Sequence, residues 1–426
     1  MGGRARMEGP HPPRRCRCPV RDSLERVPRR RGDEPMKVVS VMTTHAAGGA
    51  EFASIEMLDA LAEDGHETVV LTNRPDLGRG TRVTVRSVDL GPKLSVRSWR
   101  ALVLKAPKIV LELREALRRE APFDVLLVHY KKEQLLAALL PRRVAPRIVW
   151  AEWGPVPYPL RRGLPRLLYL AAARRAAAVL AISEGTRQSV TDVGVPAEKV
   201  TVVPNVMRTD ELGFTAAGRA RVRLGLGIPD DAFVVGCVSR FHPKKRNDVV
   251  VDAVAALDDP RVHLLLAGDG ETEFDLRARG RVLGERLHIV PTPGDDVADV
   301  LSATDVSVFC PSPTEGAPRA VILAMLAGRA CVSTGREGVH DLIPQDGGRI
   351  CSPENDVEAL RGVLAEYRDD LDLRERHGAR VAAIAHETYE RRAVARRAAA
   401  LLGQDRGPLV TTRATGSNNT EEVHGG

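Results

Sequence analysis

Short apolar runs bounded by turn residues alternate with longer amphipathic segments along most of this chain. Runs of this length are typical of buried strands, and the segments between them are long enough for helices. In the first half of the chain, the apolar runs cover residues 37–43, 67–72, 124–128, 147–150, 178–182 and 200–203. This alternation predicts parallel strands that are connected by helices.

The same pattern starts again after a polar, glycine-containing stretch at residues 208–231. A second series of apolar runs covers residues 233–238, 262–267, 306–309 and 330–333, and a long helical run follows over residues 373–402. The two series predict an α/β protein with two doubly wound, Rossmann-like domains. We place the first domain at 36–212 and the second at 213–385, and we expect a helix at 386–403 that crosses back to the first domain.

Composition changes this picture mainly at the two ends of the chain. The length of 426 residues and the hydrophobic content of 43% are sufficient for two buried cores. Ten arginines and five acidic residues fall within residues 1–35, so this segment carries +5 of the formal net charge of +7. The remaining chain is nearly neutral, which argues against a nucleic-acid partner. We expect residues 1–35 to form a disordered, arginine-rich arm and residues 404–426 a disordered tail.

The sequence offers no obvious membrane or secretion signal. The best candidate for a membrane span is interrupted by Arg174 and Arg175, and a span needs ~20 apolar residues. Residues 1–35 also lack the apolar core of a signal peptide. We therefore expect a cytoplasmic protein.

Four of the six cysteines lie in or beside the apolar runs, where a reduced thiol behaves as a small hydrophobic group. We expect these four, Cys237, Cys310, Cys331 and Cys351, to be buried. The other two, Cys16 and Cys18, have no second pair at the spacing of zinc ligands, so no metal site is predicted.

The first candidate ligand loop follows the run 37–43 and contains Gly48 and Gly49 immediately before a predicted helix. Ligands of open parallel sheets bind beyond the carboxyl ends of the strands. Two glycines allow a phosphate to approach the backbone closely, and the start of a helix favours an anion. The alternative is a tight turn that needs glycine for a positive φ. The loop lacks the GxGxxG pattern, which disfavours a nicotinamide dehydrogenase.

The second candidate loop follows the run 233–238 and contains Arg240 and Lys245. Arginine presents a planar fork to two phosphate oxygens and lysine adds a point charge, a pairing suited to a departing diphosphate. The alternative is that the run from Lys244 to Arg246 is an ordinary solvated basic face.

The third candidate loop follows the run 306–309 and contains Glu315 and Gly316, ahead of a helix predicted at 319–328. A carboxylate at this position can bind sugar hydroxyls, and glycine lets the following amides approach the ligand. The alternative is an ordinary acidic residue near the start of a helix.

With these loops in place, residues 36–400 resemble the retaining, nucleotide-sugar-dependent glycosyltransferases of family 4, which have the two-domain GT-B fold. The motifs that carry the resemblance occur in the order found in that family. They are Gly48-Gly49-Ala50-Glu51, Ile182-Ser183-Glu184-Gly185-Thr186, Val203-Pro204-Asn205, Ser239-Arg240 with Lys245, Ala267-Gly268-Asp269-Gly270, Thr304-Asp305-Val306, and residues 311–316 with Ala324-Met325-Leu326-Ala327-Gly328.

The resemblance implies two α/β domains that face each other across a cleft, and a role for each matching residue. Gly48 and Gly49 would contact the donor phosphates or the acceptor, and Arg240 and Lys245 would hold the diphosphate. Glu315 would bind the donor sugar. The backbone of Gly316, Ala317 and Pro318 would join it, and Arg319 would add to the anion site.

The resemblance also implies a reaction without a metal or other cofactor. A sugar would pass from a nucleotide-diphosphate sugar to a hydroxyl of a glycan, a lipid-linked compound or a small natural product, with retention of configuration. The departing phosphate would take the proton of the acceptor. A catalytic nucleophile paired with a second carboxylate, as in retaining hydrolases, is not evident in the sequence.

The chain departs from the family pattern at three positions. Leu323 replaces a second glutamate that usually binds the ribose, and Val206 follows Asn205 where the family has glycine. Glu152 lies where a histidine is usual. Glu152 or His129 could take the acceptor-side role of the missing histidine. The alternative is that they are a buried glutamate and a core histidine. Leu323 could simply belong to the core of its helix. These departures motivate an alternative function, a noncatalytic GT-B protein that binds a nucleotide sugar or scaffolds a partner transferase.

A basic amphipathic stretch at residues 93–119 bears on the acceptor. Apolar residues such as Trp99 and Leu111 alternate there with cations such as Lys105 and Lys108. The stretch could contact the inner face of an anionic membrane that carries a lipid acceptor. The alternative is a helix packed on its sheet with a solvated basic face.

Overall fold

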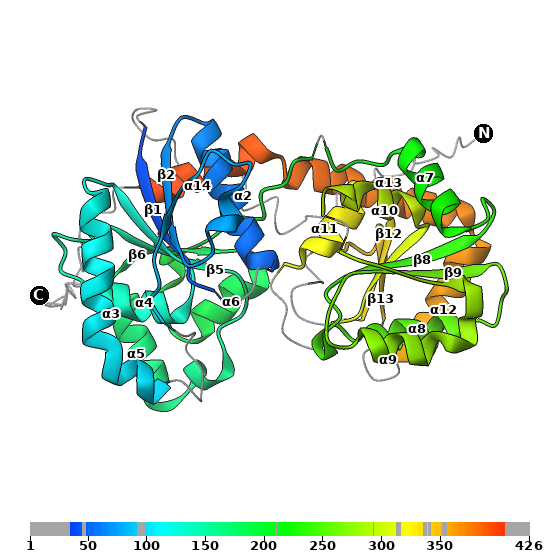
Figure 1. The fold of residues 1–426 in the computed structure, drawn as a ribbon, viewed down its shortest axis with the longest axis horizontal. Coiled ribbons are helices and arrows are strands. Elements are labelled where there is room, and N and C mark those ends of the chain that lie inside the picture. The colour runs from blue at the N-terminus through cyan, green and yellow to red at the C-terminus, as the bar shows by residue number, and fades with distance from the viewer. Residues whose placement is uncertain are drawn as a thin grey trace, which may run out of the picture.

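The computed structural model describes residues 35–44, 48–91, 99–209, 211–292, 294–311, 317–334, 339, 342–351 and 356–404, with the backbone alone for residues 99–103 and 295. Two parallel β-sheets form two domains that lie side by side, with helices on both faces of each sheet (Figure 1). The predicted fold class, two Rossmann-like domains, is confirmed. The predicted arm and tail, with Cys16 and Cys18, lie outside the described residues except for Pro35 and Gln404.

The first sheet has seven parallel strands in the order β3-β2-β1-β4-β5-β6-β7. The strands are β1 (Lys37–Val41), β2 (Glu67–Thr72), β3 (Thr84–Ser87), β4 (Val125–Val128), β5 (Ile148–Glu152), β6 (Ala176–Ala181) and β7 (Val200–Val202). One face is covered by α3 (Trp99–Glu120), α4 (Lys131–Ala138), α5 (Gly163–Ala173) and α6 (Glu184–Asp192). The other face is covered by α2 (Gly49–Glu63) and α14 (Arg391–Leu402).

The second sheet has six parallel strands in the order β10-β9-β8-β11-β12-β13. The strands are β8 (Phe233–Val238), β9 (Val262–Ala267), β10 (Leu287–Val290), β11 (Val306–Phe309), β12 (Ala330–Thr334) and β13 (Gly348–Cys351). One face packs against α8 (Asn247–Ala255), α9 (Glu273–Arg279) and α12 (Asp356–Asp369). The other packs against α7 (Ala216–Leu226), α10 (Val297–Ala303), α11 (Arg319–Leu326) and α13 (Leu371–Thr388).

The order of strands reverses once in each sheet, and these points position the candidate loops. In the first sheet the reversal falls between β1 and β4, and in the second between β8 and β11. Loops that leave such a pair of strands diverge to opposite faces of the sheet and leave a crevice at its carboxyl edge. The loop with Gly48 follows β1. The loop with Arg240 and Lys245 follows β8, and the loop with Glu315 follows β11.

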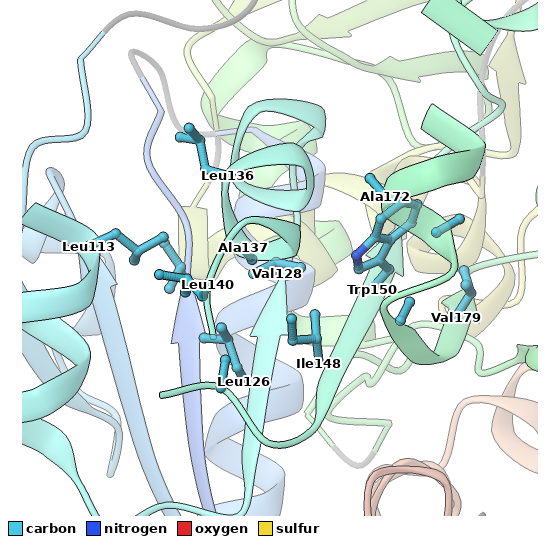
Figure 2. Close-up of a cluster of buried hydrophobic side chains, with 14 of the residues drawn as sticks. Leu113, Leu126, Val128, Leu136, Ala137, Leu140, Ile148, Trp150, Ala172 and Val179 are labelled. Carbon is cyan, nitrogen blue, oxygen red and sulfur yellow. The ribbon is translucent and has the colours of Figure 1, made fainter. Parts of the chain in front are cut away.

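A buried apolar cluster holds α3, α4 and α5 on the first sheet (Figure 2). Leu113 from α3 and Leu136 from α4 pack over strand residues such as Leu126 and Val128. The ring of Trp150 lies in the same layer, with its centroid 5.2 Å from that of Tyr169. Burial of α3 through Leu113 favours the interpretation of residues 93–119 as a helix packed on its sheet, although Leu104 and Leu111 of the same helix are exposed.

The long helical run predicted at 373–402 is two helices, because the chain turns at Tyr389 and Glu390 between α13 and α14. The Glu390 side chain caps α14 by accepting hydrogen bonds from the amides of Arg392 and Ala393. The helix α14 then packs against α2 of the first domain, where Arg391 pairs with Asp59 and Glu63. The chain therefore returns to the domain in which it began.

The four cysteines predicted to be buried are buried and unpaired. Burial raises the pKa of the Cys237 thiol to about 11, because the thiolate would lose its hydration. These thiols act as small core side chains.

Truncation of Leu113 to alanine should lower the free energy of unfolding by about 2–5 kcal/mol, because the side chain is fully buried and its removal leaves a cavity. Leu111→Ala, two residues away on the same helix, is the matched control because Leu111 is exposed. Urea unfolding followed by circular dichroism measures both. Equal midpoints for the two variants would contradict the packing of α3 described here.

Candidate functional site

The loop after β8 is fixed by close packing against the loop after β9. The amide of Ser239 donates to the carbonyl of Ala267 at 3.0 Å, and the amide of Phe241 donates to the carbonyl of Asp269 at 2.8 Å. A Cβ on Gly268 would lie 1.9 Å from the Ser239 carbonyl oxygen, and one on Gly270 would lie 2.2 Å from that of Phe241. The two glycines of the Ala267–Gly270 motif thus allow the backbones to touch and hold the Arg240 loop in place.

Lys245 lies at the end of this loop, beside the strand that leads to Glu315. It is the last residue of the short helix η4 (Pro243–Lys245). Arg246 follows in the left-handed conformation (φ 50°), pairs with Asp356, and immediately precedes α8. The Lys245 ammonium lies 5.1 Å from the centroid of the Phe309 ring, the last residue of β11. An ammonium over an aromatic face is favourable and restricts the side chain to this position.

Arg240 lies in the same loop and is exposed. Its guanidinium makes no hydrogen bond or ion pair with any residue that the structure describes. The group therefore remains available to an external anion, and its five N–H donors match the geometry of phosphate.

Glu315 and Gly316 lie outside the described residues, but both ends of their loop are placed. The loop begins after Phe309, next to Lys245. At its other end, the Ala317 carbonyl accepts a hydrogen bond from Asn205 Nδ2 at 3.2 Å, and Pro318 caps the start of α11. Arg319 forms a two-pronged pair with Glu56 of α2, at 2.5 and 2.9 Å. The end of the β11 loop thus contacts the first domain.

Gly48 and Gly49 lie at the start of α2, facing this contact. Gly48 has φ −153°, and neither glycine has a positive φ, so the alternative of a turn that requires glycine is wrong. A Cβ on Gly49 would meet the Cδ of Arg319 at 3.7 Å, which places the loops after β1 and β11 against each other. A Cβ on Gly48 would lie 3.3 Å from the Glu51 carboxylate.

The Glu51 carboxylate changes the electrostatics at the start of α2. It is buried, and it accepts hydrogen bonds from the hydroxyl of Tyr130 and, at 2.9 Å, from that of Thr44. Burial raises the pKa of Tyr130, and the Glu51 charge adds to the rise. A carboxylate beside Gly48 disfavours a phosphate at that position and favours hydroxyl groups, which can donate to it.

Glu152, the candidate for the acceptor side, lies at the end of β5 in a buried network. Both of its carboxylate oxygens accept hydrogen bonds from the Lys131 ammonium. Gln134 Nε2 and the Tyr169 hydroxyl each donate to it at 3.1 Å. A carboxylate with four such bonds is satisfied by the protein, which favours the alternative of a buried structural glutamate.

His129 is likewise a core side chain. Burial lowers its pKa to about 3, so the ring is neutral near pH 7. Trp153 Nε1 donates to Nδ1 at 2.9 Å, which leaves the proton on Nε2, where it can be shared with the Ser40 hydroxyl at 2.6 Å. Leu323 is half-buried and packs against the core beneath α11.

Glu56 and Asn205 are contributors to this region that sequence reasoning did not assign a role. The Arg319–Glu56 pair joins residues 263 positions apart, and nothing in the sequence distinguishes Glu56 from the other acidic residues of α2. Asn205 did carry a signal, because it belongs to the Val203-Pro204-Asn205 motif. Its amide reaches the second domain at Ala317.

Two Rossmann-like domains whose strand-end loops meet at their junction define the GT-B class of glycosyltransferases. Sequence comparison agrees with this assignment: the profile of Glycosyltransferase Family 4 matches residues 47–211, and that of Glycosyl transferases group 1 matches residues 232–370. The chain is a glycosyltransferase. It belongs to the GT-B glycosyltransferases of family 4, also called glycosyl transferases group 1.

Its relatives act in different contexts. The chain is 26% identical over 402 residues to a D-inositol 3-phosphate glycosyltransferase of Streptomyces avermitilis, covering 85% of this chain and 84% of that protein. It is 24% identical over 294 residues to the UDP-Gal:alpha-D-GlcNAc-diphosphoundecaprenol alpha-1,3-galactosyltransferase of Escherichia coli, covering 64% and 73%. Anabaena Alr3699/HepE, solved in complex with UDP, superimposes with a TM-score of 0.73 at 20% identity, covering 85% of this chain and 98% of that one.

The substitution Glu152→Gln should lower the free energy of unfolding by about 3 kcal/mol, because it leaves the largely buried Lys131 cation, 15% exposed, without its counter-charge. The double variant Lys131→Met/Glu152→Gln should cost less than the sum of the two single changes, since it removes both charges. Urea titrations of the four proteins measure this coupling.

Glu358→Gln is the control for this cycle, because it removes one member of an exposed pair with Arg361 and should leave the unfolding midpoint nearly unchanged. A Glu152→Gln protein with the stability of the parent and a large loss of turnover would instead indicate a direct catalytic role for Glu152.

Proposed function

We propose that this glycosyltransferase transfers a sugar from a nucleoside-diphosphate sugar to a hydroxyl acceptor with retention of the anomeric configuration. The observation that carries the proposal is the position of its cations. Arg240 and Lys245 follow β8, and Lys245 lies over the last residue of β11, the neighbouring strand at the reversal of the second sheet. Ligands of open parallel sheets bind at this point.

In this proposal Arg240 and Lys245 bind the donor diphosphate. The uncommitted Arg240 guanidinium can form two parallel hydrogen bonds to phosphate oxygens, and Lys245, held over the Phe309 ring, adds positive charge. Their charges stabilise the transition state more than the ground state, because negative charge grows on the leaving diphosphate. Alr3699/HepE has been solved with UDP and with UDP-glucose, which supports a nucleotide donor for a chain of this fold.

The chemical step would break the bond between the anomeric carbon and the phosphate oxygen and form a bond to the acceptor oxygen on the same face of the sugar. The acceptor proton would pass to the departing phosphate, so that no protein base is required. Glu315 would bind hydroxyls of the donor sugar, together with the backbone of Gly316, Ala317 and Pro318. Arg319 would contribute positive charge at the start of α11.

The acceptor would approach from the first domain, past Gly48 and Gly49. The Glu51 carboxylate lies beside Gly48 and the Arg319 side chain beside Gly49, and a carboxylate at this position suits a hydroxyl-bearing compound. The relatives named above act on an inositol phosphate and on a lipid-linked diphosphate, and these supply the first acceptors to test alongside glycans.

Lys245→Ala should lower kcat/KM for the donor by about 100-fold, because one charged group that stabilises the leaving diphosphate is lost. Lys244→Ala is the matched control: the neighbouring lysine is exposed and its substitution should leave kcat/KM close to the parent value. Transfer and donor hydrolysis are measured by release of the nucleoside diphosphate, first with UDP-sugars. Glu315→Ala should also reduce transfer.

Equal rates for Lys245→Ala and Lys244→Ala would remove Lys245 from the proposed site. Donor binding by calorimetry without turnover, across the inositol phosphate, lipid-linked and glycan acceptors, would favour the noncatalytic alternative.

We further propose that the first domain contacts an anionic membrane through its α3–α5 surface. This surface is defined by the exposed side chains Leu104, Leu111, Tyr158, Leu164, Leu167 and Leu168 and by the cations Lys105, Lys108, Arg161, Arg162 and Arg166. The helices α3 and α5 both pack on α4, on the same face of the sheet. Exposed apolar groups flanked by cations suit an interface with anionic lipid. None of the helices that the structure describes is long and apolar enough to cross a bilayer.

Flotation with vesicles of phosphatidylcholine, with and without phosphatidylglycerol, tests this contact. The chain should float with anionic vesicles at physiological salt, and the Leu164→Glu/Leu167→Glu variant should float much less, because it replaces apolar anchors by charges that anionic lipid repels. Leu224→Glu, at an exposed position of α7 in the second domain, is the control. Failure of the parent chain to bind anionic vesicles would remove the membrane contact and leave the proposed transfer reaction intact.

A further inference from the structure

A second group of arginines surrounds a cavity of about 410 Å³ in the second domain, at the amino ends of its strands. The cavity is lined by Phe214, Arg219, Asp305, Gly328, Arg329, Leu371, Arg374 and Glu375. Asp305 precedes β11 and Arg329 precedes β12, whereas Arg219 comes from α7 and Arg374 from the first turn of α13 (Figure 1). Arg240 and Lys245 lie at the carboxyl ends of the same sheet, so the cavity is separate from the proposed donor site.

Part of this arginine group is explained by the fold. The Asp305 carboxylate accepts hydrogen bonds from Arg219 at 2.9 Å, from the buried Arg223 at 2.8 Å and from the Val234 amide at 2.7 Å. Arg223 also donates to four backbone carbonyls. Asp305 thus ties α7 to the starts of β8 and β11, and this tie satisfies Arg219 and Arg223.

Arg329 and Arg374 are not explained in this way. Arg329 donates only to carbonyl oxygens, of Ala327 at 2.9 Å and Thr304 at 3.0 Å, and Arg374 donates to the Tyr367 carbonyl at 3.1 Å. Within the described part of the chain, neither has a carboxylate within ion-pairing distance. Glu375 lines the cavity but is exposed. The cavity therefore carries an excess of positive charge.

This excess charge is costly to the protein. Burial lowers the pKa of Arg329 to about 10; attraction to Asp305 opposes the lowering, and repulsion from Arg219, Arg374 and Arg223 adds to it. Such clustering of guanidinium groups is relieved when an anion binds between them.

Phe214 and Leu371 add apolar surface to the walls of the cavity. The Phe214 ring is stacked by Arg329, with the guanidinium carbon 4.8 Å from the ring centroid. Phe214 and Leu371 are 47% and 51% exposed, so both present apolar surface at the rim. A cavity of this volume is within the range of small-molecule sites. Cations at the base and apolar groups at the rim suit a small anion that also has a carbon body.

We propose that this cavity binds a small phosphorylated compound, with its phosphate between Arg329 and Arg374 and its carbon body against Phe214 and Leu371. The arginine fork matches a phosphate in geometry as well as in charge. The site is independent of the donor diphosphate, which is bound in our proposal at the other edge of the sheet.

Calorimetric titration of the full chain with glucose 6-phosphate, at constant ionic strength, tests the site. Glucose, which lacks the phosphate, is the neutral control ligand. The full chain and the Lys245→Ala variant should both bind glucose 6-phosphate, because Lys245 belongs to the donor site. Arg374→Gln should weaken binding by about tenfold or more, since a charge-assisted contact to the phosphate is lost.

Arg376→Gln is the matched control, because this exposed arginine lies on the same helix and does not line the cavity. Its affinity should equal that of the parent. Arg374→Lys keeps the charge but loses the fork, so it should give an intermediate affinity. Thermal unfolding with and without ligand confirms that each variant is folded, since a ligand of the native state raises the Tm.

Three results would overturn the proposal. The first is that the parent chain does not bind glucose 6-phosphate. The second is that Lys245→Ala loses binding while Arg374→Gln retains it. The third is that Arg374→Gln and Arg376→Gln bind with equal affinity. The second result would place the phosphate at the donor site, and none of the three would bear on sugar transfer itself.

Discussion

Parallel pairing of the strands is the constraint on which the rest of this structure depends. Because the strands of a sheet run in one direction, every loop that follows a strand is delivered to the same edge, however far apart the loops are in sequence. Arg240 and the loop that contains Glu315 are separated by some seventy residues, yet they leave neighbouring strands, β8 and β11. At such a reversal of strand order the loops diverge to opposite faces of the sheet, which is where ligands of open parallel sheets bind. At the opposite, amino edge, Asp305 with Arg219 and Arg223 has a structural role, because it connects α7 to the starts of β8 and β11.

The second requirement is that the carboxyl edges of the two sheets meet, and polar contacts connect them among the residues that the structure describes. Arg319 reaches Glu56, Asn205 reaches the Ala317 carbonyl, and Arg391 on α14 reaches Asp59. The crossing segments also touch each other, since the Met207 amide donates to the Tyr389 carbonyl at 3.3 Å. Polar contacts of this kind are directional but individually weak, so they orient the domains without fusing their cores. The apolar packing of α14 against α2 supplies the firmer attachment.

The sequence predicts the buried part of this architecture well and its margins poorly. The bounds of β2, β8, β9 and β11 match the apolar runs, because buried parallel strands are continuous hydrophobic stretches. The strands β3, β10 and β13 had no such signal: each lies at the edge of a sheet, and residues such as Arg86 and Arg349 interrupt the run. The site shows the same division. Family order and spacing make Arg240 and Lys245 candidates, and this assignment stays a prediction, whereas Glu56 carries no such signal because its contact is with a residue 263 positions away.

Glu152 shows why residue type alone is a poor guide at such a site. A glutamate at the end of β5 stands where loops gather, so catalysis is a reasonable hypothesis. In the structure, however, Lys131 and Tyr169 enclose the carboxylate and leave no open side. Arg319 is the opposite case. Its pair with Glu56 is partly exposed, with side-chain exposures of 17% for Arg319 and 29% for Glu56. Because solvent screens such pairs, they contribute little to the free energy of unfolding. A phosphate would offer the same guanidinium a stronger, charge-assisted contact. Breaking the Arg319–Glu56 pair to bind such a ligand would therefore cost little free energy. Breaking the Lys131–Glu152 pair would cost much more, because it would leave a buried carboxylate without its partner.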